Sequence, residues 1–157
     1  MSLTYNLTLN TQSTSTSIVN KTNLAQIQYN VNWDAVLPRK FQEYLLVWTL
    51  KTINTATSIN QNLFVDINFG APNTYELNQM SYKVGFVYPN VVQQDATHWS
   101  YFYQSTIYDN PPVEISYPSN NIITVKFYGF DGITAPTQAL DYVLELSFTP
   151  INTDLLR

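Results

Sequence analysis

The stretch LAQIQYNVNWDAVLPRKFQEYLLVWTLKTI, residues 24–53, contains two strongly patterned segments separated by a short loop. From residue 25 to residue 33, apolar and polar side chains alternate without a break, which is typical of a strand with one buried face. Pro38 has no backbone donor and disfavours a helical residue before it, so we expect the chain to turn there. In the second segment the even positions from residue 44 are apolar, whereas the odd positions are mixed and include Leu45 and Val47. The stretch therefore predicts two strands, the second with a partly apolar outer face.

The same alternation recurs along the rest of the chain, between turns rich in Pro, Gly and Asn. No long window shows a helical period with caps, which excludes helical bundles and α/β folds. Antiparallel strands at this spacing fit a two-sheet jelly roll, a Greek-key sandwich or an up-and-down barrel. Several connections are longer than hairpins need, which favours strands that cross between two sheets. We therefore expect an all-β fold, an eight-stranded antiparallel jelly-roll sandwich, with strands at 24–33, 43–53, 62–69, 81–88, 101–108, 113–117, 122–128 and 141–149.

The N-terminal residues are expected to form a strand arm outside this sandwich. Apolar and polar residues alternate from Leu3 to Leu9, which predicts a short strand, whereas residues 10–22 are almost all small and polar and predict an extended linker. A strand tethered in this way can add to the exposed sheet edge of a neighbouring subunit. The expected organisation is an N-terminal arm and polar linker at 1–23, a jelly-roll domain at 24–151 and a C-terminal tail at 152–157.

The composition excludes several classes of function. Charged residues make up only 11% of the chain, the formal net charge is −4, and the seven Lys and Arg residues are scattered. No basic stripe that would neutralise nucleic-acid phosphates is therefore expected. The absence of cysteine excludes disulfides and thiolate metal sites. No apolar run approaches the ~20 residues of a membrane span, and the start has no signal-peptide pattern, so we expect a soluble protein without a membrane partner.

No motif for catalysis or cofactor binding is recognisable. His98 is the only histidine, and although Asp95 and Ser100 lie near it in sequence, the glycines of a nucleophile elbow are missing. Only four glycines are present, and they do not form a phosphate-binding loop. An acid–base pair or a calcium site is conceivable among the aspartates, but they lack Asp-x-Asp spacing and are interpreted as solvated loop ends. They are Asp34, Asp66, Asp95, Asp109 and Asp131. We expect no catalytic residue, no cofactor, no metal and no enzyme activity.

Surface contacts are the kind of function that the sequence favours. The expected strand at 101–108 is aromatic on both faces, so some of its side chains must point away from one core. Core packing, subunit contacts and glycan stacking all stay open for these aromatics. Subunit contacts are favoured over glycan stacking, because an assembling protein must cover several faces. The candidate interface residues are Leu3, Tyr5, Leu7, Leu45, Val47, Tyr101 and Tyr103.

Several segments also follow one another in a definite order. An alternating strand leads into Val31-Asn32-Trp33-Asp34, then Leu37-Pro38, Phe41 and Tyr44, and later come Tyr117-Pro118-Ser119-Asn120-Asn121, Val125 and Asp141-Tyr142-Val143-Leu144 to Phe148-Thr149-Pro150. Over residues 24–151 this order resembles the single jelly-roll capsid proteins of viruses. The resemblance implies two four-stranded sheets, in subunits that assemble side by side into a shell or its vertices. Residues 1–20 carry no Lys or Arg, unlike the genome-packaging arms of small RNA-virus coat proteins, so a minor capsid or penton subunit is implied.

The expected function is therefore that of a structural capsid subunit that self-assembles through its jelly-roll faces and its N-terminal arm. The expected partners are further copies of the chain, in a pentamer or a trimer, and a major capsid protein. The expected location is the virion, after synthesis in the host cytoplasm. The alternative is a carbohydrate-binding β-sandwich, such as a lectin-like or fibre-tip domain. Surface aromatics spread around the sides favour assembly, whereas aromatics grouped with Asn and Asp in one concavity favour sugar binding.

Overall fold

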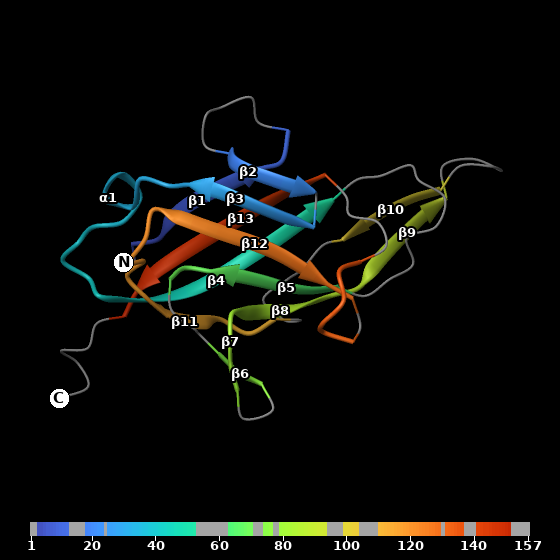
Figure 1. The fold of residues 1–157 in the computed structure, drawn as a ribbon. Helices are drawn as coiled ribbons and strands as arrows, with labels where there is room; N and C mark the ends of the chain where they lie inside the picture. Colours follow the sequence, from blue (N-terminus) through green and yellow to red (C-terminus); the bar gives the residue numbers. More distant parts are fainter. Residues whose placement is uncertain are drawn as a thin grey trace.

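Two antiparallel β-sheets stack face to face in the computed structural model (Figure 1). The structure describes residues 3–12, 18–23, 25–52, 63–70, 74–76, 79–93, 99–103, 110–129, 131–136 and 141–151. One sheet has four strands, in the order β1 (Tyr5–Asn10), β13 (Tyr142–Pro150), β4 (Glu43–Thr52) and β11 (Val113–Ser116). The other has five, in the order β2 (Ile18–Asn23), β3 (Gln26–Asn30), β12 (Ile122–Tyr128), β5 (Leu63–Asn68) and β8 (Lys83–Val87). The connections hold the four-residue helix α1 (Trp33–Val36) and two hairpins, β6 (Thr74–Glu76) with β7 (Gln79–Ser81) and β9 (Pro89–Gln93) with β10 (Trp99–Tyr103).

The strand order confirms the jelly roll. If β2 is set aside, the strands of the two sheets are, in chain order, β1, β3, β4, β5, β8, β11, β12 and β13. The four-stranded sheet then holds the first, eighth, third and sixth of them, and the facing sheet holds the second, seventh, fourth and fifth. Each sheet thus takes strands from both halves of the chain, as two interlocked Greek keys require. Apart from the consecutive strands β5 and β8, which share a sheet, the strands therefore alternate between the sheets, as the long connections in the sequence predict.

The sandwich has nine strands and not the expected eight, because seven of the expected strands are joined by two from the N-terminal segment, whereas the strand expected at 101–108 falls in a separate two-stranded sheet. β1 pairs with β13 from Tyr5 opposite Phe148 to Asn10 opposite Val143. Its apolar residues face inward, and Leu9 is 4% exposed. β2 lies within the segment expected to be a linker, and it pairs with β3 as the outermost strand of the second sheet. The expected boundary at residue 23 therefore falls between two paired strands. The six residues 152–157 of the expected tail lie outside the described part of the chain.

The strand expected at 101–108 is found only in part. Residues 99–103 form β10, which pairs with β9 in a separate two-stranded sheet, and residues 104–109 are not among those described. This segment therefore adds a hairpin beside the sandwich, where Figure 1 shows it extending past the ends of the main strands. The expected strand at 81–88 matches β8.

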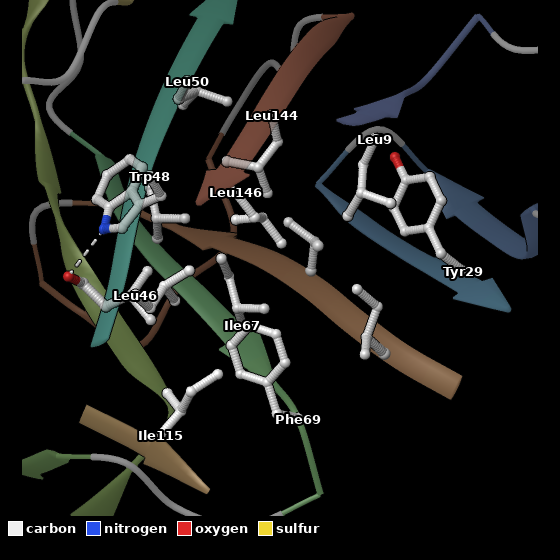
Figure 2. Close-up of a cluster of buried hydrophobic side chains, with 14 of the residues drawn as sticks. Leu9, Tyr29, Leu46, Trp48, Leu50, Ile67, Phe69, Ile115, Leu144 and Leu146 are labelled. Atoms are coloured by element: carbon white, nitrogen blue, oxygen red, sulfur yellow. Dashed lines mark hydrogen bonds between the residues drawn. The ribbon is translucent and has the colours of Figure 1, made fainter. Parts of the chain in front are cut away.

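The core lies between the sheets and is made of the inward face of every main strand (Figure 2). Trp33 and Trp48 are 1% and 3% exposed, so both lie on the buried faces that the sequence predicts. The Trp33 ring is 6.0 Å from the ring of Phe69 and 5.9 Å from that of Phe148, measured between centroids. The indole nitrogen of Trp48 donates a hydrogen bond of 3.2 Å to the carbonyl of Val84. Each tryptophan thus joins strands of both sheets.

Candidate functional site

The described residues contain no cluster suited to metal binding. No group of three or more His, Cys, Asp and Glu side chains in this part of the chain lies close enough to hold an ion. The notable sequence candidates His98, Asp95 and Asp109 lie outside the described ranges. No described helix is long and apolar enough to cross a membrane.

A shallow pocket of about 430 Å³ lies beside the first residues of β13. Its wall includes Asp141, whose two carboxylate oxygens accept hydrogen bonds from the hydroxyl of Thr11, at 2.8 Å, and the side-chain amide of Gln12, at 3.3 Å. The second carboxylate, Glu145, lies 3.8 Å from the ammonium of Lys51. Both carboxylates are thus engaged by side chains of the same chain. Asp141 holds the segment after β1 on the start of β13, and Glu145 links β13 to β4.

A second polar cluster fixes the corner between α1 and β11. Arg39 donates two hydrogen bonds to the carboxylate of Asp34, at 2.6 and 2.7 Å, and the hydroxyl of Tyr117 donates a third, at 2.8 Å. These bonds, those from Arg39 first, lower the pKa of Asp34 to about 2. Below them, the Trp33 indole donates to the carbonyl of Asn120. The corner therefore brings together the segments around Trp33 and Tyr117, which belong to the order of segments that resembles capsid proteins. All of its hydrogen bonds lie within one chain.

The outer face of the five-stranded sheet carries a ring cluster. The rings of Phe64 and Phe86 lie 4.7 Å apart between centroids, and that of Tyr88 lies 4.9 Å from Phe86. The ammonium of Lys83 lies 5.5 Å from the Phe64 ring and 5.6 Å from the Tyr128 ring. Phe64 and Phe86 are half-buried by these contacts, and only Tyr88 is exposed, at 58%.

Asp66 lies on the same outer face and is unexpectedly buried, at 9% exposure. The residues opposite it on the neighbouring strands are Lys126 and Lys83. Burial raises the pKa of Asp66 to about 6, and the two lysines act against that rise. The interpretation of this aspartate as a solvated loop end is therefore wrong, since it lies in the middle of β5.

The candidate interface residues fall into three groups. Leu3 and Leu45 are exposed, at 59% and 38%, and Val47 is half-buried on the same outer face of β4 as Leu45. Tyr5 and Leu7 face inward and pack against the core of their own chain, half-buried. The side chains of Tyr101 and Tyr103 are not among those described, although their backbone forms part of β10.

Three exposed apolar residues were not predicted. Ile133, in the loop after β12, is 80% exposed, Tyr88 is 58% exposed and Val19 of β2 is 55% exposed. The available signal was an apolar pair, Ile18 and Val19, in a polar segment, and for Ile133 an apolar residue in a loop. Together with Leu3 and Leu45, they place exposed apolar side chains on five separate segments. Models of known protein families do not match the chain, and no curated protein is detectably similar to it in sequence.

Proposed function

We propose that the protein is a structural subunit that self-assembles, of the minor capsid or penton kind, with no catalytic step. The observation that carries the proposal is the distribution of exposed apolar side chains. They lie before β1, on β2, on the outer face of β4, after β8 and in the loop after β12. A subunit with neighbours on several sides needs apolar contacts on several sides, and the jelly roll is a fold that capsid proteins use. Its partners would be further copies of the chain, as a pentamer or trimer, and a major capsid protein, within the virion.

The carbohydrate-binding alternative has less support. Among the side chains that the structure describes, the ring cluster on the outer face of the five-stranded sheet is the feature closest to a sugar platform. However, Phe64 and Phe86 are half-buried against one another and Lys83 lies against the Phe64 ring, so one exposed ring, Tyr88, is left to stack on a sugar. Where the structure describes side chains, the exposed apolar residues are spread and not grouped in one concavity, which favours assembly.

The test is the mass of the purified protein at tens of micromolar, measured by light scattering. We expect an oligomer that the change Leu45→Ser weakens, because it removes an apolar side chain from the outer face of β4. The matched control is Thr49→Ser, a small change on the same face of the same strand. A strictly monomeric wild type would contradict the proposal, and binding in a glycan screen that Tyr88→Ala abolishes would support the alternative.

A further inference from the structure

The sandwich has four edge strands, β1 and β11 in one sheet and β2 and β8 in the other. An edge strand presents unpaired backbone groups that can pair with another chain, and proteins usually block such pairing with charges, prolines, bulges or covering groups. The four edges differ in whether such a feature prevents pairing with another chain.

The edge at β8 is blocked by a side chain. The Asn110 carboxamide accepts a hydrogen bond from the Phe86 N–H, at 2.8 Å, and donates one to the Phe86 carbonyl, at 3.0 Å. It thus takes the place of a neighbouring strand at that residue. A register irregularity between Val65 and Asp66 further distorts the pairing of β5 with β8.

The edges at β2 and β11 are also unsuited to pairing with another chain. β2 has register irregularities between Ile18 and Asn20 and again between Lys21 and Asn23. β11 is only four residues long, follows two consecutive prolines and exposes the charged side chain of Glu114. A bulged strand bends away from a partner, and a proline offers no donor.

The edge at β1 carries none of these features. Residues 3–10, LTYNLTLN, contain no charged residue and no proline, and β1 pairs with β13 without a register shift. No described residue pairs with the other side of β1, although α1 lies against part of the strand. Among the described residues, β1 is therefore the edge strand with regular pairing and without a charge, a proline or a bulge.

The direction of the backbone groups can be derived from two hydrogen bonds. The Thr11 N–H donates to the Tyr142 carbonyl, and the Ile151 N–H donates to the Glu43 carbonyl. Since backbone groups of alternate residues point to opposite sides of an antiparallel strand, both bonds imply the same arrangement. The odd residues of β1 bond to β13, whereas Asn6, Thr8 and Asn10 direct their N–H and C=O groups to the free edge.

We propose that this free edge pairs with β1 of a second copy of the chain, antiparallel and about a two-fold axis. An uncharged strand can pair with itself without bringing like charges together, which is the property that favours a second copy as the occupant. Pairing satisfies the outward backbone groups and adds cover to the half-buried Tyr5 and Leu7 and to the exposed Leu3. The two four-stranded sheets then form one continuous sheet. The inference rests on the proposed function and names one of its contacts.

The edge variants are Thr8→Pro, which removes an outward donor, and Thr8→Lys, which places two ammonium groups near the two-fold axis. Thr8 is exposed and lies opposite Glu145, so the added lysine meets a carboxylate within its own sheet. The control is Ser116→Lys, the same charge on the exposed surface of β11 at the opposite edge. Light scattering should show that both Thr8 variants weaken association roughly tenfold or more, whereas the control does not. An oligomeric wild type whose association survives both changes would overturn the β1 contact alone, whereas a monomeric wild type would overturn the proposed function as well.

Cross-linking tests the same contact directly, because the chain has no cysteine of its own. A two-fold axis at residue 6 or at residue 8 would bring the two copies of that residue together, and an axis between them would bring residue 6 of one copy to residue 8 of the other. The variants are therefore Asn6→Cys, Thr8→Cys and the protein with both changes. Paired strands bring Cα atoms to about 5.5 Å, within reach of a disulfide. Mild oxidation should give a covalent dimer from at least one of these variants and none from the control Ser116→Cys. A cross-link in the control alone would move the contact to β11 and overturn the inference.

Discussion

The hydroxyls of Tyr29 and Tyr142 lie 3.0 Å apart and form a hydrogen bond, with Tyr29 as the donor, between β3 of one sheet and β13 of the other. Both side chains are buried, at 1% and 3% exposure. Burial raises the pKa of both hydroxyls, so they stay neutral across the physiological range. Two polar atoms in this core therefore depend on each other for a partner.

Two changes to phenylalanine should consequently cost less together than the sum of their separate costs. Tyr142→Phe leaves the Tyr29 hydroxyl without its acceptor, and Tyr29→Phe leaves Tyr142 without its donor, each at about 1–3 kcal/mol of the free energy of unfolding. The double variant removes both hydroxyls and should be destabilised by less than the sum. Urea unfolding of the four proteins measures the coupling. Additive losses would show that the two hydroxyls do not depend on one another.

Asp66 should make stability depend on pH. Its pKa rises from 3.8 to about 6 on folding, so the folded state binds the proton more tightly than the unfolded state does. The stability that this proton gives is fully present below pH 3.8 and is lost as pH rises through about 6. Asp66→Asn should therefore stabilise the protein at pH 7–8, by at most about 3 kcal/mol, and have little effect below pH 4.

The control for that measurement is Glu114→Gln, which removes an exposed carboxylate from β11. Unfolding midpoints of the wild type and both variants at several pH values separate a local effect from one of net charge. If Asp66→Asn stabilises the protein equally at pH 4 and at pH 8, the prediction is wrong. The pKa of Asp66 would then not be raised by its burial between Lys83 and Lys126.

Gly85 should not tolerate alanine. A Cβ at this position would overlap the Asn110 carboxamide and lie 2.5 Å from Cζ2 of Trp48. Gly85→Ala should therefore displace the side chain that blocks the β8 edge and distort the packing of a buried tryptophan, at a cost of about 1–3 kcal/mol or more. Asn110→Ala, which leaves the Phe86 backbone groups without their partner, should cost about 1–3 kcal/mol.

The fluorescence of the protein provides a second readout. Displacement of Trp48 by Gly85→Ala should change tryptophan emission, whereas Asn110→Ala, which leaves the tryptophan packed, should change it less. Chemical unfolding gives the free energies. A Gly85→Ala protein as stable as the wild type would mean that β8 shifts at no cost to make room.

Alternation of apolar and polar residues was sufficient to predict most strands and their buried faces, including those of Trp33 and Trp48. It could not predict β2, because the register irregularities of that strand interrupt the period on which the prediction depends. It could not predict the burial of Asp66 within the strand at 62–69 either, since the burial of a carboxylate on the outer face of a sheet depends on side chains of β8 and β12. The partner of β1 was equally beyond reach, because β13 lies more than 130 residues further along the chain.

Deletion of residues 1–12 tests whether the N-terminal strand is a separable arm or an integral strand of its own sandwich. As an arm, it would leave the remaining sandwich folded and change only assembly. The structure gives a different expectation, because removal of β1 exposes the inward-facing residues of β13 that lie opposite it, such as Leu146, and leaves an unpaired edge. We expect the truncated protein to melt at a clearly lower temperature.

The single change Leu9→Ala should reproduce part of this loss, at about 2–5 kcal/mol, because Leu9 is buried in the core. Thr8→Ala, on the exposed face of the same strand, should cost much less. Thermal unfolding followed by circular dichroism makes the comparison. If the truncated protein and Leu9→Ala melt like the wild type while association is lost, β1 contributes nothing to its own sandwich and acts as a separable arm between subunits.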